Sequence, residues 1–202
     1  MAGLSIRGGK MNINFKNDDS YMTPKEVWES IAHLLPKDKT IWESFYGDGK
    51  SGEYLSELGF KVEHHDIDFF EDPSFNYDII VSNPPYSCKP KIFKRLAELD
   101  KPFMMLVPVS TTTKKFLKTY FQDKIQIVIP KTRIHFIKNS VQTKSSWFDT
   151  IFIAYRMELK HDITFLYFKI DKNNYKSIMY KMSEELSGAN AQNENAQFEN
   201  IG

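Results

Sequence analysis

The sequence predicts an α/β fold in which a mostly parallel β-sheet carries helices on both faces. Strand-like apolar runs alternate with helix-like segments along the chain. Several of these runs are apolar without interruption, which is typical of strands buried on both faces. The unusual polar motifs each follow one of the runs. Ligands bind such sheets at the carboxyl ends of the strands, so the motifs predict one site at that edge.

The first expected helix begins at Thr23 and Pro24. Thr23 is predicted to cap it, Pro24 to take the first helical position and Glu26 to complete a capping box. Apolar residues at helical spacing continue to Pro36. The other expected helices cover 51–58, 90–99 and 113–121, and the expected strands cover 40–46, 60–66, 77–82, 103–107, 125–129, 147–156 and 163–170. We expect the last two strands to form an antiparallel C-terminal hairpin.

The length of 202 residues fits one compact domain, which we place at residues 20–170. Residues 1–19 are expected to form a flexible arm. Residues 183–202 are rich in Asn, Gln, Ala and Glu and are expected to be disordered. No apolar run approaches the roughly 20 residues of a membrane-spanning helix, and the first residues lack the apolar core of a secretory signal. We therefore expect an intracellular protein, cytoplasmic by default, with a nucleus or a viral factory also compatible.

Charge and cysteine content limit the possible chemistry. Cys88 is the single cysteine, so neither an internal disulfide nor a cysteine-based metal site is expected. His64 and His65 are adjacent and point to opposite faces if they lie on a strand, so we expect no metal. The net charge of +1 does not by itself indicate nucleic acid. Three basic clusters could contact phosphates or remain solvated: Lys89, Lys91, Lys94 and Arg95; Lys114, Lys115 and Lys118; Lys131, Arg133, Lys138 and Lys144.

The most specific motif is Asn83-Pro84-Pro85-Tyr86, which follows the apolar run YDIIV. The two prolines fix φ and remove two backbone donors, so they form a stiff turn with Asn83 and Tyr86 on either side. This motif resembles the catalytic motif of N6-adenine methyltransferases. The resemblance implies that the Asn83 side chain and the Pro84 carbonyl accept hydrogen bonds from the adenine amino group, while Tyr86 stacks on the flipped-out base.

The chemistry of adenine methylation fits such a site. The lone pair of the amino nitrogen is delocalised into the ring, and two correctly placed acceptors favour the pyramidal geometry from which it can attack. Proximity to the methyl donor contributes much of the remaining acceleration. A base in a duplex must be flipped out at a cost of a few kcal/mol. Stacking on an aromatic ring offsets about 1–3 kcal/mol of that cost.

A glycine motif follows the first expected strand, and its residues Phe45, Gly47 and Gly49 match the family pattern Asp-Pro-Phe-x-Gly-x-Gly. Glu43 and Ser44 depart from the Asp-Pro of that pattern. The resemblance implies that this loop binds S-adenosylmethionine, with the Glu43 carboxylate available to its ammonium group. Glycines allow the backbone to approach the methionine moiety closely.

Acidic residues follow the second expected strand. The resemblance implies that Asp66 accepts hydrogen bonds from the ribose of the cosubstrate, and that Asp68 and Phe69 hold its adenine ring, although the two acids are not assigned individually. Only 16 residues separate Asp66 from Asn83. This spacing predicts that the helix and strand which usually intervene are missing or reduced.

Two further segments resemble parts of the same family. Tyr21-Met22-Thr23-Pro24 resembles a stretch that closes over the cosubstrate, which implies roles for Tyr21 and Thr23. The segment from Arg133 to Phe136 resembles an Arg-Ile-x-Phe segment of small phage-type enzymes. That likeness implies a phosphate contact for Arg133 and a pocket wall for Phe136, and Lys89 is a further candidate for substrate binding.

The motif order resembles the gamma arrangement of amino-methyltransferases. It implies a Rossmann-like class I S-adenosylmethionine-dependent methyltransferase acting on nucleic acid, with DNA ahead of RNA. No segment is long enough for a separate target-recognition domain, so target readout is modest or comes from a partner subunit. Two alternatives stay open. One is a glutamine-amide protein methyltransferase, which uses the same four-residue motif. The other is a catalytically silent subunit of a heterodimeric adenine methyltransferase.

Overall fold

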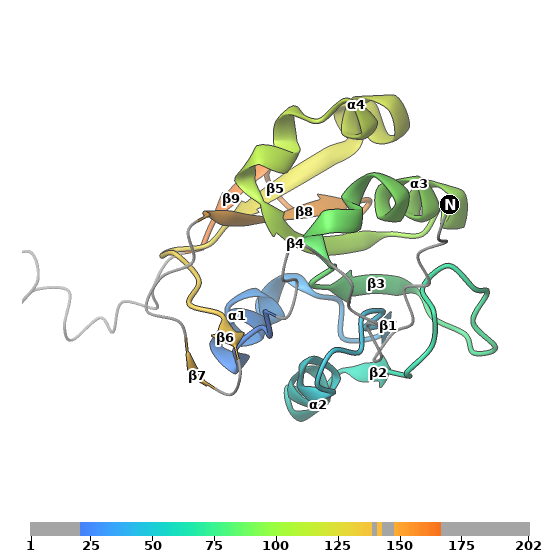
Figure 1. Cartoon of the computed structure of the whole chain (residues 1–202), viewed down its shortest axis with the longest axis vertical. Coiled ribbons are helices and arrows are strands. Elements are labelled where there is room, and N and C mark those ends of the chain that lie inside the picture. The colour runs from blue at the N-terminus through green and yellow to red at the C-terminus, as the bar shows by residue number, and fades with distance from the viewer. Residues whose placement is uncertain (1–20, 139–140, 143–147, 167–202) are drawn as a thin grey trace, which may run out of the picture. The chain divides into compact units, whose positions relative to one another are not determined.

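The structure, a computed structural model, describes residues 21–138, 141–142 and 148–166. Within these residues a seven-stranded sheet has the order β2-β1-β3-β4-β8-β5-β9, and β6 pairs with β7 in a small second sheet (Figure 1). The strands are β1 (Thr40–Trp42), β2 (Lys61–Glu63), β3 (Ile79–Ser82), β4 (Phe103–Pro108), β5 (Ile125–Ile129), β6 (Ile137–Lys138), β7 (Val141–Gln142), β8 (Thr150–Tyr155) and β9 (Ile163–Phe165). The flexible arm and the disordered tail predicted from the sequence lie outside the described residues.

The first four strands in the sheet order are parallel, and β8 lies antiparallel between β4 and β5. The Rossmann-like α/β fold predicted from the sequence is therefore confirmed. One detail differs, because β8 and β9 are not paired with each other. The side chain of Gln126 on β5 donates to the carbonyl of Leu159 and accepts from its N–H. These bonds hold the connection beside β5, and β9 pairs with the far side of β5 in parallel.

Alternating side chains divide the apolar core into two clusters, one on each face of the sheet. Helices cover both faces of the sheet, as Figure 1 shows. On one face, α1 and α2 pack with residues such as Ile41 and Val81, and on the other, α3 and α4 pack with Trp42 and Ile80. The helical segments are α1 (Lys25–Ile31), α2 (Lys50–Glu57), α3 (Lys89–Leu99) and α4 (Lys115–Phe121), with 3-10 turns η1 (Ala32–Leu34), η2 (Tyr86–Cys88), η3 (Val109–Thr113) and η4 (Gln122–Lys124). No helix in the described part of the chain is long and apolar enough to cross a membrane.

The capping predicted for α1 is wrong. Pro24, not Thr23, is the N-cap residue, and no side chain hydrogen-bonds the helix start. Thr23 is 3% exposed, and its hydroxyl finds no hydrogen-bond partner in the described residues. The segment before α1 pairs through its backbone with Ile137, which turns the Thr23 side chain to the interior rather than along the helix.

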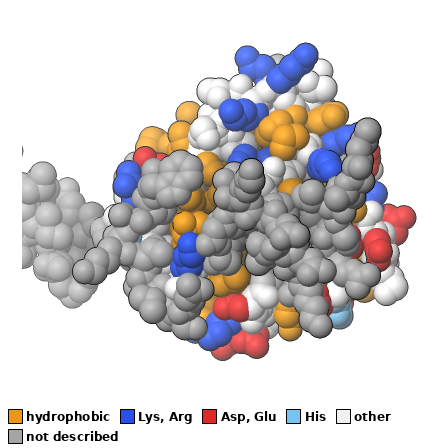
Figure 2. All heavy atoms as spheres, in the orientation of Figure 1, with side chains coloured by type: hydrophobic (Ala, Val, Ile, Leu, Met, Phe, Trp, Pro, Cys, Tyr) orange, Lys and Arg blue, Asp and Glu red, His pale blue; other side chains and the backbone are white. Residues whose placement is uncertain are grey.

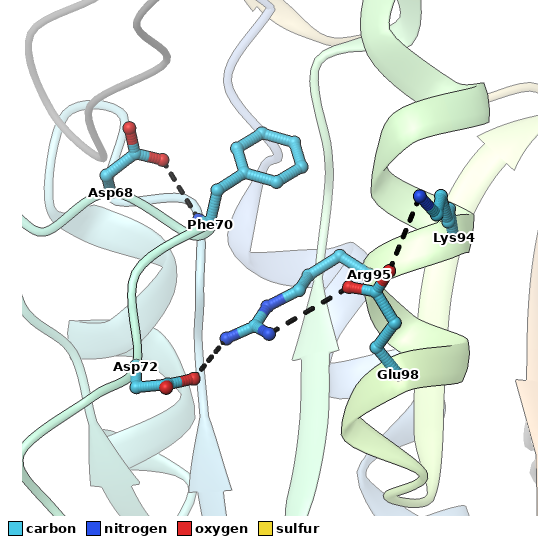
Figure 3. Close-up of polar contacts among 6 residues, drawn as sticks. All are labelled: Asp68, Phe70, Asp72, Lys94, Arg95 and Glu98. Atoms are coloured by element: carbon cyan, nitrogen blue, oxygen red, sulfur yellow. Dashed lines mark hydrogen bonds and ion pairs between the residues drawn. The ribbon is translucent and has the colours of Figure 1, made fainter.

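The connection between β2 and β3 is short and irregular, as the spacing of the acidic motif predicts. Residues 64–78 contain turns and bends, with no helix and no ladder strand. They nevertheless cover the sheet, because Phe69 is completely buried and Phe70 and Phe75 pack against the same cluster. Arg95 on α3 holds this segment through Asp72, as Figure 3 shows.

Candidate functional site at the carboxyl edge

The predicted motifs meet at one edge of the sheet. The strands β1, β2 and β3 are parallel neighbours, so their carboxyl ends lie side by side. The glycine motif follows β1, the acidic motif follows β2 and the Asn-Pro-Pro-Tyr motif follows β3. The segment from Tyr21 to Thr23 joins them, because the Met22 sulfur lies 3.1 Å from the point where a Cβ on Gly47 would stand.

A buried carboxylate connects the three strand ends. Glu43 is 1% exposed, and it is the single charged side chain among the described residues that are buried. Its Oε1 accepts a hydrogen bond from the Ser82 hydroxyl, and its Oε2 lies 2.9 Å from Nδ1 of His64. Burying a carboxyl group without polar partners costs free energy, so the Ser82 hydroxyl and the His64 ring stabilise Glu43 at this position.

His64 is a site residue that the sequence reasoning missed. Its ring packs 4.5 Å from the ring of Tyr46, centroid to centroid, and its side chain is 12% exposed. It also lies directly against α2, where a Cβ on Gly52 would stand 2.2 Å from the ring. Gly52 is the third residue of α2, and a glycine within a helix is unfavourable by up to about 1 kcal/mol relative to alanine. That unusual choice at Gly52 is the signal that could have revealed a large neighbour.

The glycine loop has the backbone geometry that its sequence predicts. Gly47 and Gly49 have φ angles of 58° and 86°, a region that residues with a Cβ rarely adopt. Gly49 is the N-cap of α2, and its N–H donates to the carbonyl of Tyr46. Phe45 is half-buried beside the loop and packs on Phe69.

Asn83 is held by the segment that precedes α1. Its Nδ2 donates to the Tyr21 carbonyl at 3.3 Å, so the amide oxygen Oδ1 is the acceptor that this side chain presents. That Oδ1 is buried and has no hydrogen-bond partner in the described part of the chain. The peptide bonds of Pro84 and Pro85 are trans, and Pro85 has an extended ψ of 121°.

Aromatic rings line the side of this motif. Tyr86 lies edge-on to Phe148, with 5.4 Å between ring centroids, and Phe148 in turn contacts Phe136 and Tyr21 at 6.0 Å each. Phe136 is completely buried, so it supports the wall from behind. Phe148 was not predicted, because nothing in its local sequence distinguishes it from a strand residue.

The two predicted basic residues lie at this wall. Lys89 donates to the Tyr86 carbonyl at 2.6 Å, and its ammonium lies 5.4 Å from the centre of the Tyr86 ring. Arg133 is exposed and donates from Nε to Asp149 at 2.8 Å. Asp149 also accepts, through its carbonyl, from the N–H of Val109 at the end of β4. Arg133 therefore lies between the Phe136 segment and the end of β4.

The acidic motif is placed differently from the glycine and Asn-Pro-Pro-Tyr motifs. Asp66 is exposed, and Asp68 turns back to accept from the N–H of Phe70 at 3.0 Å, as Figure 3 shows. Phe69 is completely buried between Phe45 and Trp42, with centroid distances of 4.9 and 5.5 Å. Its ring is thus a core element that supports Phe45, and the partly exposed ring in this turn is that of Phe70.

Several buried polar atoms at this edge find no hydrogen-bond partner within the described residues. They come from the ends of β1, β2 and β3 and from the segment before α1: Ser44 Oγ, His64 Nε2, Asn83 Oδ1 and Thr23 Oγ1. Leaving such an atom unsatisfied costs about 1–3 kcal/mol, and most native proteins avoid it. A cluster of them at the ligand-binding edge of an α/β sheet is the arrangement expected of a site that completes its hydrogen bonds with a ligand.

No protein-family model and no curated protein matches the chain. Among solved structures it is similar to a protein of Listeria monocytogenes described as a class I S-adenosylmethionine-dependent methyltransferase, with 12% identity over 83% of this chain and 72% of that one and a TM-score of 0.44. It is also similar to the 23S rRNA methyltransferase ErmE, with 15% identity over 67% and 69% and a TM-score of 0.44. A dimethyladenosine transferase from Plasmodium falciparum matches with 9% identity over 66% and 62% and a TM-score of 0.42. Similarities at this level do not assign the chain to a family.

The contact between Gly52 and His64 predicts that the effect of Gly52→Ala on the free energy of unfolding changes sign when His64 is removed. In the native chain, Gly52→Ala should lower the free energy of unfolding by about 1–3 kcal/mol, because the new Cβ overlaps the imidazole. In a His64→Ala background the overlap is gone, so the same substitution should stabilise by up to about 1 kcal/mol through helix propensity. Urea unfolding of the four proteins in this double-mutant cycle measures both effects. A destabilisation of equal size in both backgrounds would contradict the contact.

Proposed function

We propose that the protein transfers a methyl group from S-adenosylmethionine to the N6 amino group of adenine in nucleic acid, with DNA favoured over RNA. The observation that carries this proposal is the Asn83 side chain. Its amide is oriented by the Tyr21 carbonyl, and its Oδ1 is a buried acceptor without a partner in the described residues. An acceptor beside a rigid Pro-Pro turn is suited to a ligand that brings an N–H to that point.

The acceptor's position depends on a rigid support. Ser82 directly precedes Asn83 and is tied to Glu43, so the end of β3 is fixed to the ends of β1 and β2. Electrostatic and orientational effects require such pre-organisation, because a donor or acceptor that must move during the reaction contributes less. We therefore assign Asn83 and the Pro84 carbonyl as acceptors for the amino group, and Ser82 and Glu43 as residues that position them.

The glycine loop after β1, at the same edge of the sheet, is suited to the cosubstrate. Gly47 and Gly49 present backbone without Cβ atoms, and the unsatisfied hydroxyls of Ser44 and Thr23 offer hydrogen bonds near them. The Oε1 of Glu43 accepts from Ser82, whereas its Oε2, 2.9 Å from Nδ1 of His64, has no hydrogen-bond partner in the described residues and offers an acceptor to the cosubstrate. When bound, S-adenosylmethionine supplies an electrophilic methyl group on its sulfonium.

The remaining predicted residues are assigned by position. The exposed Asp66 and the turn at Asp68 lie after β2, where they can serve the ribose and adenine of the cosubstrate. Phe69 acts there only as support for Phe45 and for the turn. On the substrate side, Tyr86 stacks on the base, with Phe148 and Phe136 behind it. Lys89 fixes the Tyr86 backbone, and the exposed Arg133, which pairs with Asp149, would contact a phosphate near the pocket.

The first test of the reaction is transfer of tritiated methyl from S-adenosylmethionine to matched duplex DNA, single-stranded DNA and RNA, followed by nucleoside analysis. We expect N6-methyladenine in at least one pool. Labelled glutamine in a peptide pool, with none in nucleic acid, would favour the protein methyltransferase instead. Cosubstrate binding without transfer to any pool would favour the silent subunit.

The role of Asn83 predicts a selective loss. Asn83→Ala should lower kcat by at least about 10²-fold, the size of effect seen when one pre-organised polar group is removed from an active site. Binding of S-adenosylmethionine, measured by isothermal titration, should change little. Gln126→Ala is a suitable control, because Gln126 also holds a backbone segment through its amide but lies on β5 away from this edge. Near-normal turnover of Asn83→Ala would contradict the assignment.

The stacking role of Tyr86 predicts a graded series. Tyr86→Ala should raise the KM for nucleic acid by roughly 5- to 100-fold, which corresponds to the loss of about 1–3 kcal/mol of stacking. Tyr86→Phe retains the ring and should be much milder. The affinity for S-adenosylmethionine should stay close to that of the native protein in both. Equal KM values for all three proteins would exclude stacking on this residue.

A further inference from the structure

We propose that η3 and the exposed face of α4 form a docking surface for the phosphate backbone of the substrate strand. The choice of ligand rests on the proposed function, since nucleic acid is the polyanion that the site would have to hold. We define the η3–α4 surface by Ser110, Thr113, Lys114, Lys115 and Lys118. All five side chains are exposed.

The three basic clusters of the sequence differ in whether Asp and Glu side chains of the same protein pair with them. In the α3 cluster, Lys94 pairs with Glu98, and Arg95 pairs with Asp72 and Glu98 (Figure 3). In the third cluster, Arg133 pairs with Asp149. By contrast, Lys114, Lys115 and Lys118 form no ion pair within the part of the chain that the structure describes. Each of the other two clusters contains members paired with acids, whereas no lysine of the α4 cluster pairs with an acid among the described residues, so its charge is left for another molecule.

The local sequence retains this charge at a cost to the helix. The α4 segment, KFLKTYF, contains no acidic residue. Lys118 lies three positions after Lys115, so these two ammonium groups share one side of the helix, and Lys114 directly precedes it as the extended N-cap residue. Like charges at this spacing destabilise a helix by a few tenths of a kcal/mol per pair. Figure 2 shows Lys and Arg side chains gathered over α4, with Asp and Glu side chains lower on the same face.

The η3–α4 surface is on the same side of the sheet as the site. The strand β4 is parallel to β3, and η3 follows its last residue, so η3 begins beside the Asn-Pro-Pro-Tyr turn. A chain of contacts joins the two places. Val109 at the start of η3 donates to the carbonyl of Asp149, and the adjacent Phe148 packs on Tyr86. A strand whose base stacks on Tyr86 is thereby directed over η3 and toward the lysines.

The test compares two variants with the same change of charge. Lys114→Gln/Lys115→Gln/Lys118→Gln removes the surface, whereas Lys39→Gln/Lys61→Gln/Lys101→Gln removes three exposed lysines at the amino edge of the same sheet. Binding of fluorescein-labelled single-stranded DNA, duplex DNA and RNA to the full chain is measured by anisotropy between about 50 and 200 mM salt. Loss of three phosphate contacts lowers the slope of log K against log salt by about 2 to 3, at roughly 0.7–0.9 per contact.

We expect this reduced slope for the α4 variant and a change of less than about 1 for the amino-edge variant. Equal losses in the two variants would show a net-charge effect alone and overturn the proposal, as would an unchanged slope in the α4 variant. Binding to phosphatidylserine vesicles in preference to every oligonucleotide would also overturn it. The readout does not require turnover, so the two proposals can fail separately. Oligonucleotide binding through α4 without methyl transfer would support the docking surface and contradict the proposed reaction. Methyl transfer with unchanged binding in the α4 variant would support the reaction and contradict the docking surface.

Discussion

The buried carboxylate of Glu43 is the interaction on which the arrangement of the site depends. It receives a hydroxyl from β3 and an imidazole from the end of β2, so three strand ends meet on one charged group. An apolar contact at this point would allow the loops to shift, because dispersion forces have little directionality. A buried carboxyl group does not, since each misplaced partner leaves a buried polar atom without compensation. The position of Asn83 therefore depends on the bond between Glu43 and Ser82, the residue that precedes it. The same network explains the glycine at position 52, because the His64 imidazole occupies the space that a Cβ would take.

Much of the fold could be predicted from the sequence, because continuous apolar runs such as Ile79–Val81 and Phe103–Val107 identify buried strands directly. Helix patterns were equally clear where apolar spacing was regular, as in α3. The pairing of β8 and β9 was not predictable in this way. Whether two successive strands form a hairpin depends on what the connection contacts, and here it bonds to Gln126 and Ile127 of β5, more than thirty residues away in sequence. The Thr23 cap failed for a similar reason, because the backbone pairing of Met22 with Ile137 overrides local capping chemistry.

The site was predictable where a motif is contiguous and was not where residues meet only in space. The Asn-Pro-Pro-Tyr turn and the positive-φ glycines are encoded within a few residues each. His64 and Phe148 act through partners at least 12 residues away, and the glycine at position 52 is the one local sign of such a contact. For Phe69 the sequence position suggested a role in the site, but the structure places its ring in the core. Its position after β2 indicated a ligand contact, yet the short connection to β3 has to bury an aromatic ring to cover the sheet, and Phe69 is that ring.

The pairing of Met22 with Ile137 has a consequence for co-translational folding. The glycine loop and Asn83 are synthesised early, but Asn83 is oriented by Tyr21, and the neighbouring Met22 is held by backbone bonds to Ile137, which is synthesised more than fifty residues after Asn83. Phe148, which supports Tyr86, follows later still. A nascent chain that has exposed only the first three strands therefore has the motif without its support. Competence for binding should arise late and abruptly during translation, when the residues of β6 and of the segment after β7 leave the exit tunnel, rather than growing with each strand that is added.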